Sequence, residues 1–127
     1  MSDRLLQELC EKIFLINKNI RFAGVITKMG RLVAGGMRPD IDSLEDREDS
    51  SKLYVQFALM TEMRKDFDDI FGKAIYSFTE REKIKLASFP LDDTHILRVS
   101  IEKKEKDHTQ IIQNILNIIR TLIQSQI

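Results

Sequence analysis

Cysteine, proline, histidine and tryptophan are scarce in this 127-residue chain, which holds one Cys, two Pro, two His and no Trp. Because Cys10 has no partner, no disulfide can form within the chain, as is usual in a reducing cytoplasm. Long apolar runs are also missing, since none approaches the roughly 20 residues of a membrane-spanning helix. Charges at Asp3, Arg4 and Glu8 interrupt any apolar core of a signal peptide. We therefore expect a soluble cytoplasmic protein without a membrane partner.

An excess of charge of either sign is missing too. Lys and Arg together number 20, and Asp and Glu together number 20, so the formal net charge is zero. Nucleic-acid binding needs an excess of cations that displaces counterions from phosphates, so we expect no nucleic-acid partner. A net charge near zero weakens the repulsion between copies of the chain and permits self-association.

Catalytic and cofactor-binding motifs are absent from the sequence, which has no phosphate loop, dinucleotide fingerprint, zinc-ligand spacing or nucleophile elbow. His95 and His108 have no nucleophile motif nearby, so surface positions suit them better than roles as general bases. Cys10 lies among apolar positions of an expected helix, where a small buried side chain is more usual than a reactive thiol. We expect no enzyme activity, no catalytic residue, no metal and no cofactor.

The most acidic segment, residues 40–49, is a remaining candidate for a site. Asp40 and Asp42 have the spacing that begins a calcium-binding loop. Glu45 then stands where that loop requires glycine, and Ser51 stands where it requires a bidentate glutamate. The segment therefore fits a solvated loop, or a docking patch for a basic partner, better than a metal site.

Apolar periodicity divides the chain into three helices and five strands. Spacings of three and four residues predict helices over Ser2–Lys18, over Ser51–Phe71, and from Asp107 or Thr109 to about Ser125. Alternation predicts strands over Ile20–Thr27, Arg31–Met37, Ala74–Thr79, Lys83–Leu91 and Ile96–Glu102. Residues 28–30 fit a hairpin loop, and residues 38–50 fit a polar loop.

Short polar links between the last three strands predict an antiparallel meander. One side of these strands is apolar and the other is more polar, as expected for a sheet that is covered on one face. The sequence therefore predicts a single α+β domain over residues 1–127. Its five-stranded antiparallel sheet would have the order helix-strand-strand-helix-strand-strand-strand-helix.

This order of elements resembles the roadblock/dynein light chain fold, a relative of the profilin-like and longin folds, over essentially the whole chain. The first hairpin carries the motif, with Gly24–Val25–Ile26 in one strand, a turn at Gly30, and Leu32–Val33–Ala34 in the next. The sequence also resembles small uncharacterised archaeal proteins. The roadblock resemblance implies a homodimer, in which the long central helices pair or the sheets join edge to edge. It further implies a surface that holds a small GTPase or scaffold subunits.

Two of the expected helices are more apolar than a single stripe against a sheet requires. Leu59 and Met63 widen the apolar side of the central helix, and Arg64 lies beside them. Ile112 and Ile119 belong to a last helix that is apolar on more than one side. We therefore expect a non-enzymatic protein-interaction or scaffold module that acts as a homodimer, with these five residues binding the partner.

A second hypothesis is a small-ligand sensing domain of the PAS-like or profilin-like kind. Large apolar side chains from different predicted elements would line its pocket, namely Phe22, Met60, Tyr76 and Phe89. The two hypotheses differ in what they require of the structure, because the first needs exposed apolar surface and the second needs an enclosed cavity.

Overall fold

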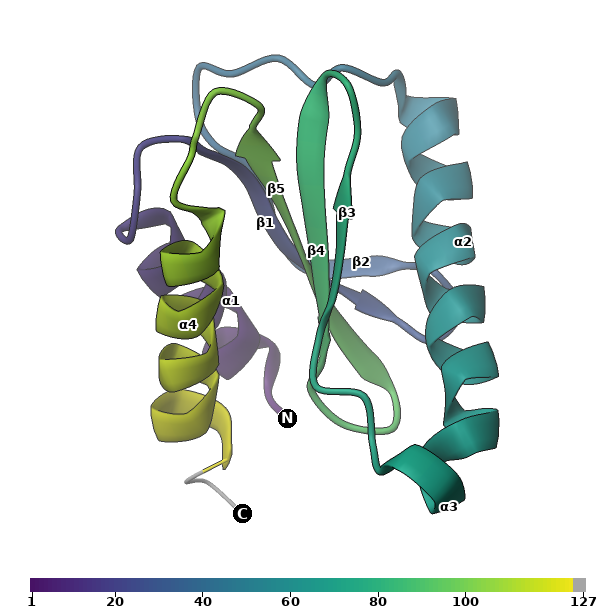
Figure 1. Cartoon of the computed structure of the whole chain (residues 1–127). Helices are drawn as coiled ribbons and strands as arrows, with labels where there is room; N and C mark the ends of the chain where they lie inside the picture. The colour runs from purple at the N-terminus through teal and green to yellow at the C-terminus, as the bar shows by residue number, and fades with distance from the viewer. Residues whose placement is uncertain (125–127) are drawn as a thin grey trace.

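The computed structural model describes residues 1–124 and places helices on both sides of one five-stranded sheet (Figure 1). The helices are α1 (Asp3–Phe14), α2 (Arg47–Arg64), α3 (Asp68–Phe71) and α4 (His108–Ile118). The strands are β1 (Ile20–Thr27), β2 (Leu32–Met37), β3 (Ser77–Glu80), β4 (Ile84–Pro90) and β5 (His95–Glu102). A 3₁₀ turn (Lys65–Phe67) links α2 to α3, and a π-helical turn (Ile119–Ile123) extends α4. The predicted α+β class and order of elements are confirmed.

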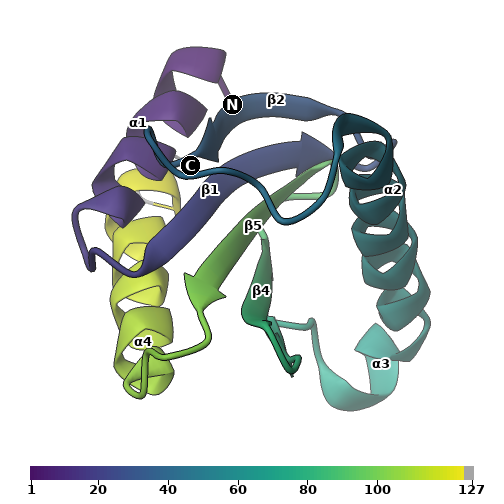
Figure 2. The ribbon, with the colours of Figure 1, turned by 90° about the horizontal axis from the view of Figure 1, so that it is seen from above.

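Neighbouring strands are all antiparallel, in the spatial order β2-β1-β5-β4-β3. The predicted meander of β3, β4 and β5 is present, and the pairing of β5 with β1 joins it to the first hairpin. α1 and α4 cover one face of the sheet, whereas α2 covers the other (Figure 2). The prediction of a sheet covered on one face was therefore wrong. Polar residues that alternate along β5, such as Arg98 and Ser100, are buried on the α2 side.

The main core lies between the sheet and the two helices α1 and α4. It is filled by apolar side chains from α1, β1, β5 and the last helix, including Leu6, Leu9, Ile13, Val25, Leu97, Val99, Ile111, Ile112, Ile115, Ile119 and Ile123. The apolar excess of the last helix is thus largely buried within the same chain. No helix within residues 1–124 has both the length and the apolar character needed to cross a bilayer.

The side chain of Arg38, which follows β2, caps the C-terminal end of α1. Its Nε donates to the carbonyl oxygen of Ile20 at 2.7 Å, and its Nη2 donates to the carbonyl oxygens of Phe14 and Asn17 at 2.8 Å. The guanidinium carbon also lies 4.9 Å from the centre of the Phe14 ring. The last carbonyl groups of a helix have no intrahelical donor, so Arg38 supplies one. α1 therefore ends at Phe14 rather than at the predicted Lys18.

Two further differences from the predicted boundaries have a clear structural cause. α2 begins at Arg47 rather than Ser51, because the carboxylate of Asp46 accepts a hydrogen bond from the Asp49 N–H at 2.8 Å and caps the helix. β3 begins at Ser77, since the preceding residues 73–76 are exposed and do not pair with β4. The predicted end of the last helix near Ser125 lies outside the described residues.

Gly35 allows β2 to lie close to β1 and α1. Its φ is +73°, and a Cβ at this position would be 2.1 Å from the carbonyl oxygen of Ala23 and 2.7 Å from Sγ of Cys10. Burial raises the pKa of the Cys10 thiol to about 12, so the side chain is an uncharged, buried thiol at neutral pH. Cys10 thus fills space beside the hairpin, in agreement with the expectation of a small buried side chain.

Candidate protein-interaction surface

One side of α2 and α3 leaves a line of large apolar side chains exposed. We call it the α2 apolar stripe, and it consists of Val55, Leu59, Met60, Met63, Phe67, Ile70 and Phe71. The exposed fraction is 67% for Met63, 71% for Ile70 and 80% for Phe71. Ile75 and Tyr76 are also exposed and follow in the segment that leads into β3. A run of exposed apolar side chains of this kind marks an interaction site.

The stripe lies on the side of α2 that is turned away from the sheet. The buried residues of α2 are Ala58 and Thr61, and Ala58 packs with Ile26 and Ile96 on the sheet. At about 100° per residue, the stripe occupies the other side of the helix from these two positions. Tyr54 and Phe57 pack beside Ala58 on the sheet-facing side. α2 is therefore apolar on two sides and uses only one of them within the chain.

Beneath α2, the sheet carries a buried arginine. Arg98 is 2% exposed, and its guanidinium carbon lies 4.6 Å from the centre of the Phe22 ring and 5.5 Å from those of Tyr54 and Phe57. Among residues 1–124, nothing accepts a hydrogen bond from its Nε or Nη1. Burial lowers the pKa of Arg98, while the charges of Tyr54 and Glu45 act to raise it. Aromatic faces, rather than a paired carboxylate, hold this cation.

Replacing Arg98 with methionine should leave the protein as stable as the wild type, or about 1 kcal/mol more stable. Methionine keeps apolar contact with the three rings and removes donors whose burial without an acceptor costs roughly 1–3 kcal/mol. Urea unfolding measures the difference. A loss of more than about 2 kcal/mol would show instead that the contacts between the cation and the rings outweigh the unmet donors.

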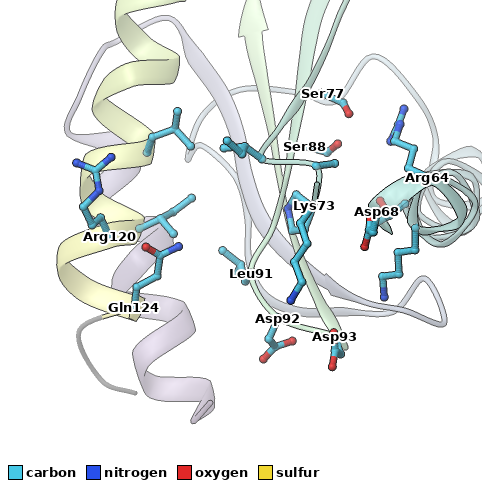
Figure 3. A pocket seen from close by; sticks show the side chains of 17 residues that line it. Arg64, Asp68, Lys73, Ser77, Ser88, Leu91, Asp92, Asp93, Arg120 and Gln124 are labelled. Atoms are coloured by element: carbon cyan, nitrogen blue, oxygen red, sulfur yellow. The ribbon is translucent and has the colours of Figure 1, made fainter. Parts of the chain in front are cut away.

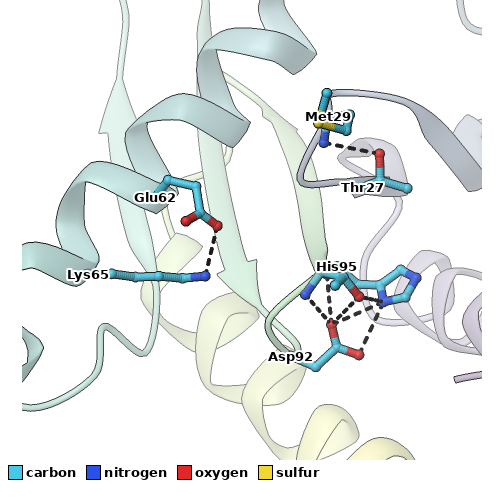
Figure 4. A network of polar contacts seen from close by, with 7 residues as sticks. Thr27, Met29, Glu62, Lys65, Asp92 and His95 are labelled. Atoms are coloured by element: carbon cyan, nitrogen blue, oxygen red, sulfur yellow. Dashed lines mark hydrogen bonds and ion pairs between the residues drawn. The ribbon is translucent and has the colours of Figure 1, made fainter.

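Charged side chains border the stripe near its middle. Nζ of Lys65 donates to the carboxylate of Glu62 at 2.8 Å, one helical turn away (Figure 4). This hydrogen bond lowers the pKa of Glu62 and raises the pKa of Lys65. Since Glu62 and Lys65 are largely in water, the ion pair contributes little to stability. The ion pair lies at the edge of the stripe and leaves the apolar side chains of the stripe exposed.

Both histidines have structural contacts. In the turn between β4 and β5, the Asp92 carboxylate accepts hydrogen bonds from the backbone N–H groups of Thr94 and His95, both at 2.8 Å, and lies 3.0 Å from Nδ1 of His95 (Figure 4). Burial acts to raise the pKa of Asp92, but these hydrogen bonds outweigh it and the pKa is lowered. The ring of His108 stacks on Phe78 with ring centres 4.5 Å apart.

Three of the five predicted partner-binding residues lie on or beside the stripe. Leu59 and Met63 belong to it, and Arg64 is half-buried at its margin. Ile112 and Ile119 are each 4% exposed and pack in the main core, so this fold leaves them unavailable to a partner. Sequence alone could not separate these cases, because a helix covered by α1 has the same apolar pattern as a helix covered by a second subunit.

The helix predicted over Ser51–Phe71 is interrupted by the 3₁₀ turn at Lys65–Phe67. Phe67 and Phe71, at the end of the stripe, lie within and after this turn and are 56% and 80% exposed. A 3₁₀ turn changes the angle per residue, so the spacing of side chains along α2 does not continue into α3. No feature of the apolar pattern marks this change of helix type.

The pocket expected of a ligand-sensing domain does not form from the predicted residues. Phe22 packs against Tyr54 on the α2 side, with ring centres 6.1 Å apart. Phe89 is part of the main core on the other face of the sheet, where it stacks with Tyr76 at 6.0 Å. Met60 is exposed in the stripe. These side chains therefore cannot line one cavity.

Residues 5–120 match a sequence family described as "Family of unknown function (DUF6659)", and the chain belongs to that family. No individually curated protein shows significant sequence similarity to it.

Solved structures share the fold along nearly the whole chain. The gliding protein MglB of Thermus thermophilus has a TM-score of 0.72 at 10% identity, covering 96% of this chain and 90% of that chain. A Roadblock/LC7 domain from Streptomyces avermitilis has a TM-score of 0.64 at 10% identity, covering 94% of this chain and 92% of that chain. Profilin of Schizosaccharomyces pombe has a TM-score of 0.60 at 10% identity, covering 91% of this chain and 97% of that chain. The chain therefore has the roadblock and profilin-like fold that its element order predicted.

Proposed function

We propose that this protein is a non-enzymatic interaction module that acts as a homodimer, with the α2 apolar stripe as the surface between the two copies. The observation that carries the proposal is the exposure of Leu59, Met63 and Ile70, at 58%, 67% and 71%, on the outer side of one helix. Burying such side chains contributes roughly 25 cal/mol per Å² of apolar surface removed from water.

A second copy of the chain is a suitable partner for this stripe. In a two-fold dimer the same patch lies on both sides of the interface, so an apolar stripe meets its own equivalent. The formal net charge of zero leaves little repulsion between copies.

Helix pairing is better supported than joining of the sheets at their edges. At one edge, Gly35 and Gly36 have φ values of +73° and +150°, so the β2 backbone is irregular there. At the other edge, β3 comprises only the four residues Ser77–Glu80. Short or irregular edge strands are poor templates for pairing with another chain.

The remaining surface of the dimer would hold a protein partner in the cytoplasm, such as a small GTPase or a scaffold subunit. The support for this part is the fold, which is shared with MglB and the Roadblock/LC7 domain, together with the lack of catalytic motifs in the sequence. Affinity purification from the native cell would test it, and a partner captured by the wild type and lost on the Met63→Glu change would support binding to the dimer rather than to a single copy.

Sedimentation velocity tests the homodimer directly. The molar mass that sedimentation gives for the wild type should be about twice the 14.8 kDa of one chain. Replacing Met63 with glutamate should weaken the dimer by about 100-fold or more, since each copy would bury an unpaired carboxylate.

Gln113→Glu is the matched control, because it adds the same charge at an exposed position on α4. It should leave the dimer unchanged, and circular dichroism should show both variants folded. A wild type that is monomeric from micromolar to millimolar concentration would overturn the proposal, as would equal weakening by both variants.

A further inference from the structure

A cavity of about 570 Å³ lies between the end of α2, the segment 73–77, the end of β4 and the last helix (Figure 3). This volume falls within the roughly 300–1,000 Å³ that is usual for small-molecule sites. None of the residues of the α2 apolar stripe lines it. The cavity is therefore distinct from the stripe itself, although Arg64, at the margin of the stripe, borders both.

One wall of the cavity carries two free hydroxyl groups. Directly paired residues place Gly24, Arg98, Ser88 and Ser77 in one row across β1, β5, β4 and β3. Paired residues in an antiparallel sheet point to the same face, so Ser88 and Ser77 share the α2 side with Arg98. Both serines line the cavity, and within residues 1–124 neither hydroxyl makes a hydrogen bond. They remain free to bind a ligand.

A cation without a partner stands beside these hydroxyl groups. Arg64 of α2 lines the cavity, is half-buried, and forms no hydrogen bond or ion pair with the described part of the chain. Figure 3 shows Arg64 at the same end of the cavity as Ser77 and Ser88. A guanidinium presents several N–H donors in a fixed plane, which suits a carboxylate or a phosphate.

Two of the three acidic residues that line the cavity lie toward its other end. Asp92 and Asp93, in the turn after β4, are at the lower end in Figure 3, with the ammonium group of Lys73 directed toward them. The carboxylate of Asp92 also accepts hydrogen bonds from backbone N–H groups within the turn. The third, Asp68, lies near Arg64 in Figure 3 but forms no ion pair with it within residues 1–124. The guanidinium of Arg64 and the two serine hydroxyl groups are therefore still available to a negative group.

The last helix contributes the polar side chains of Arg120 and Gln124 to the cavity, together with apolar side chains. Leu116 and Ile119 come from the last helix, and Ile75, Pro90 and Leu91 come from the segments that meet it. A ligand held by its negative group near Arg64 would place an apolar body along these apolar side chains. The pairing of a few polar groups with an apolar lining is the usual composition of a small-molecule site.

We propose that this cavity binds a small organic anion, a carboxylate or a phosphate ester, with Arg64, Ser77 and Ser88 holding the negative group and Leu116 and Ile75 contacting the apolar body. This binding function goes beyond the proposed dimer and does not depend on it. It also differs from the ligand site that the sequence suggested, because none of the four residues named there lines the cavity.

Titration calorimetry with five probes tests the proposal: octanoate, octyl phosphate, 1-octanol, octylammonium and inorganic phosphate. Octanoate or octyl phosphate should bind saturably and shift the amide signals of Ser77 and Ser88 in NMR spectra. Arg64→Gln should weaken that binding about tenfold, because one charge-assisted contact is lost. Arg47→Gln, which removes an exposed arginine at the start of the same helix, should leave it unchanged.

Binding of octanoate but not octyl phosphate would identify the ligand as a carboxylate. Binding of octyl phosphate but not octanoate would identify it as a phosphate ester. Either result would support the proposal. Equal binding of 1-octanol or octylammonium would overturn it, because the negative group would then be irrelevant. Binding of inorganic phosphate alone, or of none of the probes, would also overturn it. Ser77→Ala provides a second variant with an expected loss of about threefold, and unchanged sedimentation of Arg64→Gln would separate this test from that of the dimer.

Discussion

Replacing Arg38 with methionine should lower the free energy of unfolding by about 3 kcal/mol. The guanidinium donates to three backbone carbonyl oxygens, those of Phe14, Asn17 and Ile20, at 2.7–2.8 Å. Methionine can keep some contact with the Phe14 ring, but it leaves these acceptors without their donor. Equilibrium unfolding in urea at a fixed protein concentration measures the loss.

Arg31→Met is the control for this experiment. Arg31 is exposed at the hairpin turn, and its side chain makes no hydrogen bond with residues 1–124. Its replacement should change stability by less than about 0.5 kcal/mol. If the two methionine variants lost equal stability, Arg38 would not be the residue that fastens the end of α1 to the sheet.

Replacing Gly35 with alanine should cost more than about 3 kcal/mol, or prevent folding, because of steric overlap and backbone strain together. The added Cβ would lie 2.1 Å from the carbonyl oxygen of Ala23, a backbone atom that cannot turn aside as a flexible side chain can. The hairpin would have to separate, and the packing of β2 against α1 would be lost with it. Thermal unfolding followed by circular dichroism measures the effect.

Gly72→Ala separates the strain from the overlap. Gly72 has a similar φ of +80°, but a Cβ there would have nothing within 4 Å. Its replacement should therefore cost only the left-handed backbone strain, about 1 kcal/mol. Similar losses at Gly35 and Gly72 would mean that the strand pair adjusts easily and that the close approach at Gly35 is unimportant.

The predicted strands agree well with the structure where alternation coincides with burial. The bounds predicted for β1, Ile20–Thr27, are those observed, and β5 differs by one residue at its start. The strand predicted for β3 is too long because Ala74–Tyr76 alternate like a strand, although they are exposed and unpaired. Alternation reports that side chains point in opposite directions, but it does not report whether a neighbouring strand is present.

The site was harder to predict than the fold, because exposure depends on how elements pack. Arg98 occupies a position that alternates with apolar residues, which predicts a side chain facing water, yet α2 covers it. The isoleucines of the last helix show the opposite error, since α1 covers a surface that the apolar pattern assigns to a partner. In both cases the missing information was which helix lies on which face.

The two faces of the sheet differ in how firmly their helices are packed. α1 and α4 share a continuous apolar core with the sheet, whereas α2 touches it through small residues and the rings around Arg98. The residues that determine folding are therefore largely distinct from those available for recognition. Over evolutionary time, such an arrangement lets the outward side of α2 change its binding preference while the rest of the domain keeps its shape.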